Sequence, residues 1–250
     1  MAIMMKTPQE VEKMRRSGQA VREILNYVSA LVEPGLTTMD LEQAAETRMK
    51  EMGLKPAFKG YRGFPCVLCT SVNQEVVHGI PSAARKLREG DIVSVDTGVV
   101  MDGYYGDSAT TVLVGKKIDP RTQKLVEVTE ASLAAGIAAV KAGATLGDIG
   151  AAVQEVVEAA GFSVVREFVG HGIGTKLHED PQVPNYGRRG QGQKLKAGMV
   201  FCIEPMVNVG RPEVTVLEDG WTAVTQDGSM SAHFEHTVAV TEDGALILTE

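Results

Sequence analysis

Apolar residues near the start of the chain recur with the spacing of an α-helix. The four residues before them, Thr7-Pro8-Gln9-Glu10, form a capping box with proline at the first helical position, and Pro34-Gly35 interrupts the pattern. A second helix is predicted from Thr37 or Thr38 to a glycine cap at Gly53. The apolar positions that define the two helices are Val11, Met14, Val21, Leu25, Val28 and Leu31, then Leu41, Ala45 and Met52.

A similar pair of helices is predicted in the second part of the chain. Asp119-Pro120 caps the third helix, and Gly143 and Thr145 introduce a fourth that ends at Gly161. A shift of 108 residues aligns Val32 with Val140, Gly35 with Gly143, Thr37 with Thr145, Asp40 with Asp148, Ala44 with Ala152 and Gly53 with Gly161. We interpret this offset as two structural halves, roughly 1–117 and 118–250, of one domain over 1–250. A chance likeness between two capped helix pairs is the alternative.

Apolar, β-branched runs predict strands between and after the helices. Ile92–Val100 and Thr110–Gly115 flank Asp102-Gly103, a strong hairpin signal. The other predicted strands are Met199–Val207 and Glu235–Val240, followed by a turn at Asp243-Gly244. Helices combined with hairpin-connected strands predict an α+β fold.

The composition permits a large buried core and indicates no nucleic-acid partner. Of the 250 residues, 44% are hydrophobic, and the net charge is −7 with acidic residues spread along the chain. Nucleic-acid binding needs a basic face, whereas the densest basic cluster, Lys13, Arg15, Arg16 and Arg22, is typical of a solvated helix face. No apolar run is long enough for a signal peptide or a membrane span, and three cysteines argue against a disulfide framework. We therefore expect a cytoplasmic protein with no membrane association.

Acidic residues stand in two predicted strands, where burial is costly unless they are paired or bind a metal. Asp96 follows Ile92–Val95, and Glu204 follows Val200–Ile203. Asp96 and Asp107 flank the same hairpin turn, so pairing of its strands would place the two carboxylates opposite or diagonal to each other. Such carboxylates repel unless one is protonated or a cation lies between them. The pattern favours a divalent metal.

Further side chains extend this candidate ligand set. His171 lies between glycines in Gly170–Gly174, where the backbone can turn tightly and expose the imidazole, and Glu235 adds another strand carboxylate. Four carboxylates and one imidazole suit Mn²⁺, Fe²⁺, Co²⁺ or Zn²⁺. Two ions roughly 3.5–4 Å apart, sharing bridging carboxylates, balance the charge better than one. Taken alone, each acid is better explained as a surface or ion-paired residue, and His171 as a hydrogen-bonded loop histidine.

Five stretches of the sequence resemble the type I methionine aminopeptidases, in order and spacing, over essentially the whole chain. They are NQEVVHGIP (Asn73–Pro81), VSVDTGVVMDGYYGDSATT (Val93–Thr111), GHGIGTKLHEDPQVPNY (Gly170–Tyr186), FCIEPM (Phe201–Met206) and FEHTVAV (Phe234–Val240). The resemblance implies the pita-bread fold, a strongly curved antiparallel sheet flanked by helices, with pseudo-two-fold halves. It implies a compact type I enzyme, because the span from Gly161 to Glu204 leaves no room for the type II helical insertion.

The resemblance also implies a reaction and its metal ligands. The enzyme would remove the initiator methionine of nascent proteins when the second residue is small. Matching positions give the ligands as Asp96, Asp107, His171, Glu204 and Glu235. Asp96 would hold one ion and His171 with Glu204 the other, while Asp107 and Glu235 bridge both. A bridging water activated by the two metals would attack the scissile carbonyl, and Glu204 would take up its proton.

The same matching implies a substrate pocket. The catalytic residues would be His78, His178 and Glu204, where each imidazole donates to the developing oxyanion or holds the scissile amide. The residues around the methionine would be Tyr61, Phe64, Cys69, His78, His178 and Trp221. The alternatives are structural hydrogen bonds for the two histidines and ordinary core packing for Trp221, which follows Asp219-Gly220 and is expected on a loop.

Two positions depart from the family pattern. Leu177 stands where an aromatic residue is common, so the pocket is expected to be roomier there. Cys202 stands where threonine is usual, and strand alternation puts it on the same face as Glu204. This thiol is expected to make the enzyme sensitive to oxidation or soft metals, and unchanged sensitivity in Cys202→Ser would rule that out. Cys66 and Cys69 form a C-x-x-C motif, but only one further cysteine is available for a zinc site, so Cys69 is interpreted as pocket wall.

The implied partners are nascent polypeptides that begin with methionine, together with a transient ribosome contact, and the chain is expected to be a monomer. The alternatives are a proline-directed peptidase of the same fold, a non-catalytic binding module on this fold, and a globular protein whose acids are merely solvated. Because Ala2 is small, Met1 is expected to be self-removed, and intact mass of the cellular protein checks this.

Overall fold

Helices and short antiparallel strands alternate along the chain, which the computed structural model describes over residues 3–250. The helices of this range are α1 Pro8–Leu31, α2 Thr38–Glu51, α3 Pro120–Ala138 and α4 Leu146–Ala159, with a 3₁₀ turn η1 at Tyr61–Gly63. The strands are β1 Lys55–Pro56, β2 Leu68–Val72, β3 Glu75–Val77, β4 Ile92–Met101, β5 Tyr104–Leu113, β6 Ser163–Val164, β7 Gly170–Gly172, β8 Glu179–Val183, β9 Val200–Ile203, β10 Met206–Asn208, β11 Val214–Val216, β12 Ala223–Thr225, β13 Ser231–His233, β14 His236–Val240 and β15 Ala245–Ile247. The α+β class is confirmed. The predicted self-removal of Met1 concerns the bond between Met1 and Ala2, and these two residues lie outside the described range.

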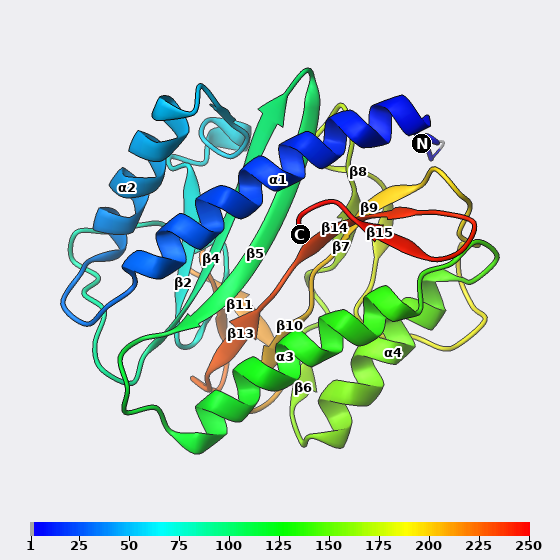
Figure 1. The fold of residues 1–250 in the computed structure, drawn as a ribbon. Coiled ribbons are helices and arrows are strands. Elements are labelled where there is room, and N and C mark those ends of the chain that lie inside the picture. The colour runs from blue at the N-terminus through cyan, green and yellow to red at the C-terminus, as the bar shows by residue number, and fades with distance from the viewer. Residues whose placement is uncertain (1–2) are drawn as a thin grey trace.

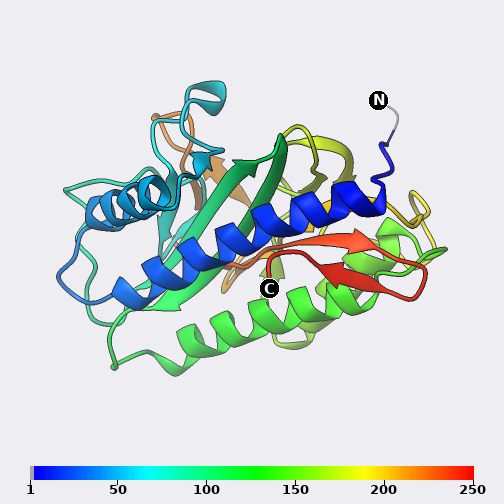
Figure 2. The ribbon, with the colours of Figure 1, turned by 45° about the horizontal axis from the view of Figure 1, so that its top comes forward.

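All four predicted helices form, and their caps explain where they begin. The Thr7 hydroxyl accepts from the Glu10 amide, while the Glu10 carboxylate accepts from the Thr7 amide at 2.8 Å. Helices α2 and α4 begin with capping boxes of Thr37 and Thr145, each paired with an aspartate three residues later. Helices α1 and α3 lie on the same side of the sheets, with the C-terminal segment between them (Figures 1 and 2).

The hairpin β4–β5 is the longest strand pair and forms the centre of one sheet. Asp102 and Gly103 have φ of 51° and 80°, so both occupy the left-handed region that a two-residue hairpin turn requires. Strand β4 also pairs with β1 and β2. A second sheet has the order β15-β14-β9-β7-β8 and carries the strands of the second half.

Three strand predictions need correction. The strand predicted at Thr110–Gly115 extends over Tyr104–Leu113, since its first part pairs fully with β4. The strand predicted at Met199–Val207 is two strands, because Pro205 has no N–H to donate and the ladder of β9 ends at Ile203. Strand β9 pairs with β14, whereas β10 pairs with β13 in another sheet. Glu235 lies just before β14 and forms an isolated bridge with Ala109.

The offset of 108 residues recurs in the backbone hydrogen bonds. The Gly35 amide donates to Leu87 at 2.9 Å, and the Gly143 amide donates to Leu195 at 3.0 Å. One buried cluster packs α1 and α2 against β2 and β4, and a second packs α3 and α4 against β9 and β14. A third cluster contains residues from both halves and includes Phe64, Cys69 and Cys202. The boundary near residue 117 and the single domain stay predictions.

Candidate functional site

The hairpin β4–β5 places Asp96 and Asp107 diagonally across its ladder. Asp96 pairs in register with Ala109, and Asp107 pairs with Gly98. Both carboxylates are buried, and both line the same cavity. The diagonal arrangement is one of the two that the sequence predicts, and it brings the acids together because the two-residue turn fixes the register of the strands.

His171 lies in β7, with its backbone pressed between two neighbouring strands. A Cβ at Gly170 would lie 2.2 Å from the Cys202 carbonyl oxygen, and one at Gly172 would lie 2.2 Å from that of Asp180. The glycines therefore permit close strand packing. The prediction that they form a tight turn, which would expose the imidazole, is wrong because His171 lies within a strand. His171 Nδ1 lies 3.0 Å from the Gly172 carbonyl oxygen, which leaves Nε2 directed at the carboxylates.

Glu204 and Glu235 reach the same cavity from the second half of the chain. Glu204 Oε1 lies 3.6 Å from His171 Nε2, and Asp107 Oδ2 lies 3.8 Å from the same nitrogen. The Glu235 amide donates to the Ala109 carbonyl at 3.0 Å, which joins β5 to the segment before β14. The cavity, of about 150 Å³, is lined by all five predicted ligands. The structure thus brings together residues that are up to 139 positions apart in the sequence.

The four carboxylates are strongly desolvated and lack compensating partners. Each has one buried oxygen without a hydrogen-bond partner among the described residues: Asp96 Oδ1, Asp107 Oδ1, Glu204 Oε1 and Glu235 Oε1. Within residues 3–250, the close contacts of these acids with a basic side chain are those of Asp107 and Glu204 with His171 Nε2. Burial raises the pKa of Asp96 to about 7. Burial first, and neighbouring carboxylates second, raise the pKa of each of the other three acids well above its ordinary range.

The donor set fits divalent cations. Burial lowers the pKa of His171 to about 4, so its imidazole is neutral and able to act as a ligand near pH 7. Ligand atoms of Asp107, His171, Cys202 and Glu235 all lie within 4.8 Å of one another. Cations between these groups would offset the carboxylate repulsion and engage the partnerless oxygens. Cys66 and Cys69 are buried free thiols outside this cluster.

The rest of the cavity wall is mostly aromatic and apolar. It contains the six residues expected around the substrate, together with Phe58, Arg62 and Leu177. The rings of Phe64 and Trp221 pack edge to face with centroids 5.1 Å apart, and Trp221 lies on a loop as expected. Leu177 is buried in this wall. Sequence reasoning missed Phe58 and Arg62, although both lie within three residues of Tyr61 in the segment that forms this wall.

Two further histidines line the cavity beside the acids. The rings of His171 and His178 have centroids 4.1 Å apart, and His178 Nδ1 lies 2.9 Å from the Tyr61 hydroxyl. Burial lowers the pKa of His178 to about 3 and also lowers the pKa of His78. His78 has φ of 61°, a left-handed conformation that costs free energy for a residue with a Cβ. Such strain is concentrated at functional positions.

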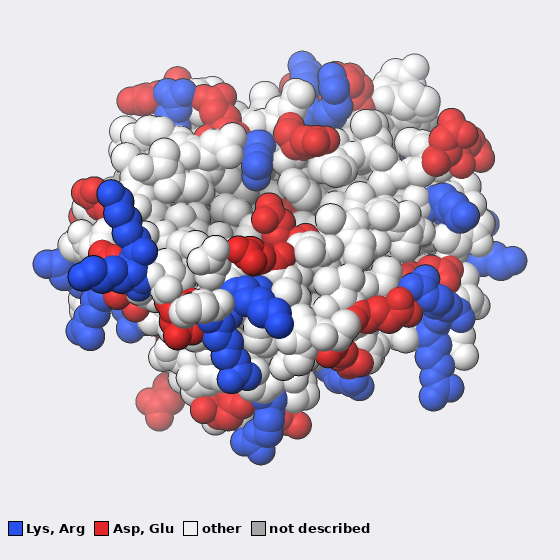
Figure 3. Space-filling model, turned by 60° about the horizontal axis from the view of Figure 1, so that its bottom comes forward, with Lys and Arg blue, Asp and Glu red and all other residues white. Residues whose placement is uncertain are grey.

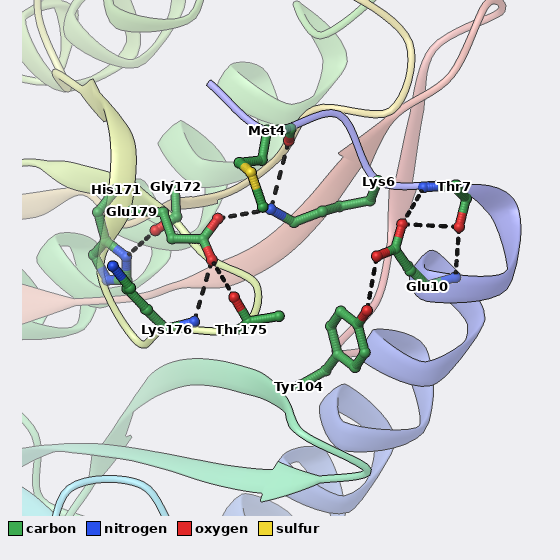
Figure 4. Close-up of polar contacts among 10 residues, drawn as sticks. All are labelled: Met4, Lys6, Thr7, Glu10, Tyr104, His171, Gly172, Thr175, Lys176 and Glu179. Carbon is green, nitrogen blue, oxygen red and sulfur yellow. Dashed lines mark hydrogen bonds and ion pairs between the residues drawn. The ribbon is translucent and has the colours of Figure 1, made fainter. Parts of the chain in front are cut away.

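A buried ion pair fixes the loop that carries His178. Lys6 Nζ donates to Glu179 Oε2 at 2.6 Å, while the amide of Lys176 donates to Glu179 Oε1 at 3.1 Å (Figure 4). The backbone of Lys6 is held by its amide, which donates to the Gly198 carbonyl at 2.7 Å. The segment before α1 thereby positions the loop beside the cavity.

Comparison with known proteins identifies the family of this chain. The model of metallopeptidase family M24 matches residues 12–242. Methionine aminopeptidase A of Synechocystis is 52% identical over 240 residues, which cover 96% of this chain and 94% of that protein. The crystal structure of methionine aminopeptidase from Thermotoga maritima superposes with a TM-score of 0.97 at 51% identity, covering 100% of both chains. The chain belongs to the methionine aminopeptidases of metallopeptidase family M24. It is therefore a hydrolase, a metallo-exopeptidase, with the pita-bread fold.

The proline-directed alternative shares only the fold. An Xaa-Pro dipeptidase from Bacillus anthracis superposes with a TM-score of 0.78 at 20% identity, and the match covers 98% of this chain but 62% of the dipeptidase. The sequence favours the methionine-specific branch over the proline-directed one. This agrees with the higher identity and TM-score of the methionine aminopeptidase structure.

The surface of the protein mixes both signs of charge on the face shown in Figure 3, where Lys and Arg side chains lie among Asp and Glu side chains. Over residues 3–250, no helix is both long enough and apolar enough to cross a membrane. The absence of nucleic-acid binding and of membrane association stays an expectation from the sequence.

Proposed function

We propose that this enzyme removes the initiator methionine from newly made polypeptides whose second residue is small, using two divalent cations. The observation that supports it is a set of four partnerless carboxylate oxygens and one imidazole nitrogen in a cavity whose remaining wall is mostly aromatic and apolar. An oxygen-rich set with one nitrogen suits Mn²⁺, Fe²⁺, Co²⁺ or Zn²⁺. Four acids carry more charge than one divalent ion would balance, which favours two.

The proposed ligand division follows the resemblance to the family, and the short distance between His171 and Glu204 supports it. Asp96 would hold one cation, and His171 with Glu204, whose atoms are 3.6 Å apart, would hold the other. Asp107 and Glu235 would lie between both. When bound, such a pair lowers the pKa of water and polarises a carbonyl. Glu204 would accept the proton from the attacking water, because its carboxylate lines the cavity beside the proposed cations.

The substrate would be oriented by the two cavity histidines and by the aromatic wall. Tyr61 lies against Nδ1 of His178, so the far side of that imidazole is available to stabilise charge on the scissile carbonyl oxygen. His78 would hold the scissile amide. Phe64, Cys69 and Trp221 would surround the methionine side chain, whose thioether gains from contact with aromatic rings.

Peptide turnover tests this proposal. Metal-free protein refilled with Mn²⁺, Fe²⁺, Co²⁺ or Zn²⁺ should release methionine from Met-Ala-Ser and leave Xaa-Pro peptides intact. Asp107→Asn should lose activity with every metal, whereas Glu158→Gln, which changes an exposed acid on α4, should retain it. Faster cleavage of the Xaa-Pro peptides, or turnover that survives complete metal removal, would contradict the proposal.

We also propose the cellular setting that the activity favours. The enzyme would act in the cytoplasm as a monomer and meet nascent chains through a transient ribosome contact. Light scattering on the purified protein should give the mass of a single chain, and ribosome co-sedimentation should weaken as salt is raised. A dimer mass, or no co-sedimentation at low salt, would contradict the corresponding part.

A further inference from the structure

Cys202 brings a sulfur atom into the carboxylate cluster. It lies in β9 two residues before Glu204 and is fully buried. Its sulfur, an oxygen of Asp107, a nitrogen of His171 and an oxygen of Glu235 all lie within 4.8 Å of one another. The thiol is free and lies 3.5 Å from the Thr237 hydroxyl.

The acids beside this thiol provide an independent indication of a ligand. Asp107 Oδ1 and Glu235 Oε1 are buried and partnerless among the described residues, and both residues line the cavity. The Thr237 hydroxyl donates to the Asp107 carbonyl oxygen at 2.7 Å, so its proton is already committed there. The thiol is therefore the donor in its contact with Thr237, and its sulfur lies near two carboxyl groups that each have a partnerless oxygen.

We propose that Cys202 supplies a thiolate to a thiophilic divalent cation, such as Zn²⁺ or Cd²⁺, bound together with Asp107, His171 and Glu235. One sulfur, one nitrogen and two oxygens form a four-coordinate set that such cations favour. Binding replaces the S–H bond with a sulfur–metal bond and releases one proton. The inference rests on the proposed function, since three of these side chains also belong to the proposed catalytic centre.

This second binding mode would be inhibitory. Catalytic metal sites keep a coordination position open for water or substrate, whereas a site closed by four protein ligands does not. A cation held through Cys202 would occupy Asp107 and Glu235, which the catalytic pair needs between its ions. Cadmium, or excess zinc, should therefore inhibit this chain through Cys202.

Cobalt spectroscopy tests the sulfur ligand directly. The metal-free protein titrated with Co²⁺ should develop a thiolate-to-metal charge-transfer band in the near ultraviolet, in addition to its visible ligand-field bands. Cys202→Ser should lose the charge-transfer band and keep the visible bands. Cys66→Ser and Cys69→Ser should keep both, because these buried thiols lie outside the cluster.

Calorimetry and folding controls complete the test. Cys202→Ser should weaken Cd²⁺ binding by at least about 10–100-fold, the loss typical of perturbing even an outer partner of a metal site. Cys202→Thr, which keeps a similar side-chain volume, should behave in the same way, and the thermal midpoint of each variant shows whether it is folded. Two results would overturn this inference and leave the proposed function standing. One is visible bands without a charge-transfer band in the unmodified protein, and the other is a charge-transfer band that survives in both Cys202 variants. Failure of the unmodified protein to bind Co²⁺ would overturn the proposed function as well.

Discussion

At the scale of single residues, the buried carboxylates should make the metal-free fold less stable as the pH rises above about 6.5. The pKa of Asp96 in the folded chain is about 7, and those of Asp107, Glu204 and Glu235 are also raised, so the folded chain keeps protons that the unfolded chain has released. A raised carboxyl pKa favours the fold at low pH, and this contribution is lost as the pH rises through the folded-state pKa. The five histidines, whose pKa values burial lowers, oppose this trend only while the unfolded chain still binds protons near the ordinary histidine pKa of about 6.5, so their effect fades as the pH rises further.

Thermal unfolding in chelator checks this sign. The midpoint should fall between pH 6.5 and about 8, and saturating Mn²⁺ should remove most of the slope because cations replace the retained protons. A midpoint in chelator that stays constant or rises over this window would contradict the assignment.

His178 offers a second prediction at this scale. His178→Ala should lower kcat for Met-Ala-Ser by about 10²–10³-fold, the range for losing one donor to a developing oxyanion. His236→Asn changes a histidine outside the cavity that contacts the Thr249 hydroxyl, and serves as the matched control. Equal losses in both variants would show that the effect is structural.

At the scale of elements, the segment before α1 is predicted to stabilise the His178 loop. The Lys6 and Glu179 side chains are only 4% and 11% exposed, so removing one partner leaves a buried charge. Lys6→Met should cost about 3 kcal/mol of unfolding free energy, at the lower end for a broken buried pair because Glu179 keeps the Lys176 amide as donor.

Urea denaturation of a variant set measures this. The double change Lys6→Met with Glu179→Gln should recover much of the loss, since no buried charge is left. Arg189→Met, which breaks the exposed pair with Glu155, should cost no more than about 1 kcal/mol. If Lys6→Met and the double variant are equally stable, an unpaired buried charge does not explain the loss, and the result would contradict this prediction.

The elements also show how far sequence reasoning reaches. The helices were predictable because caps such as Thr7 with Glu10 act within one turn, and Asp102-Gly103 set the hairpin register locally. The division of 199–207 was not predicted, because the apolar run dominates and Pro205 acts through strand pairing. The role of Gly170 depends on a carbonyl 32 residues away, which no local pattern reveals.

At the scale of the whole molecule, the site lies where the two halves meet. Strand β5 contacts the segment before β14 through the Ala109–Glu235 bridge, and the Ser108 hydroxyl donates to the Glu235 carbonyl at 2.6 Å. The offset that aligns the helix pairs also aligns Asp96 with Glu204, a signal in the sequence that the helical repeat alone did not bring out. Convergence of the five side chains required the sheet topology, whereas their identity followed from the family motifs.

Metal binding should therefore stabilise the whole fold. Ions that bind only the folded chain, at about 100 times their dissociation constant, contribute about 2.7 kcal/mol per site, and this raises the midpoint by about 5–10 °C for a chain of this size. Asp107→Asn should abolish most of the shift measured by calorimetry, and Glu158→Gln should leave it unchanged. An equal shift in Asp107→Asn would place the binding elsewhere.

Anomalous diffraction from crystals loaded with Mn²⁺ tests the central claim most directly. The account predicts two anomalous peaks in the cavity, both in contact with Asp107 and Glu235, one also bound by Asp96 and the other by His171 and Glu204. A cavity without peaks at saturating Mn²⁺, or peaks that none of these five side chains contacts, would contradict it.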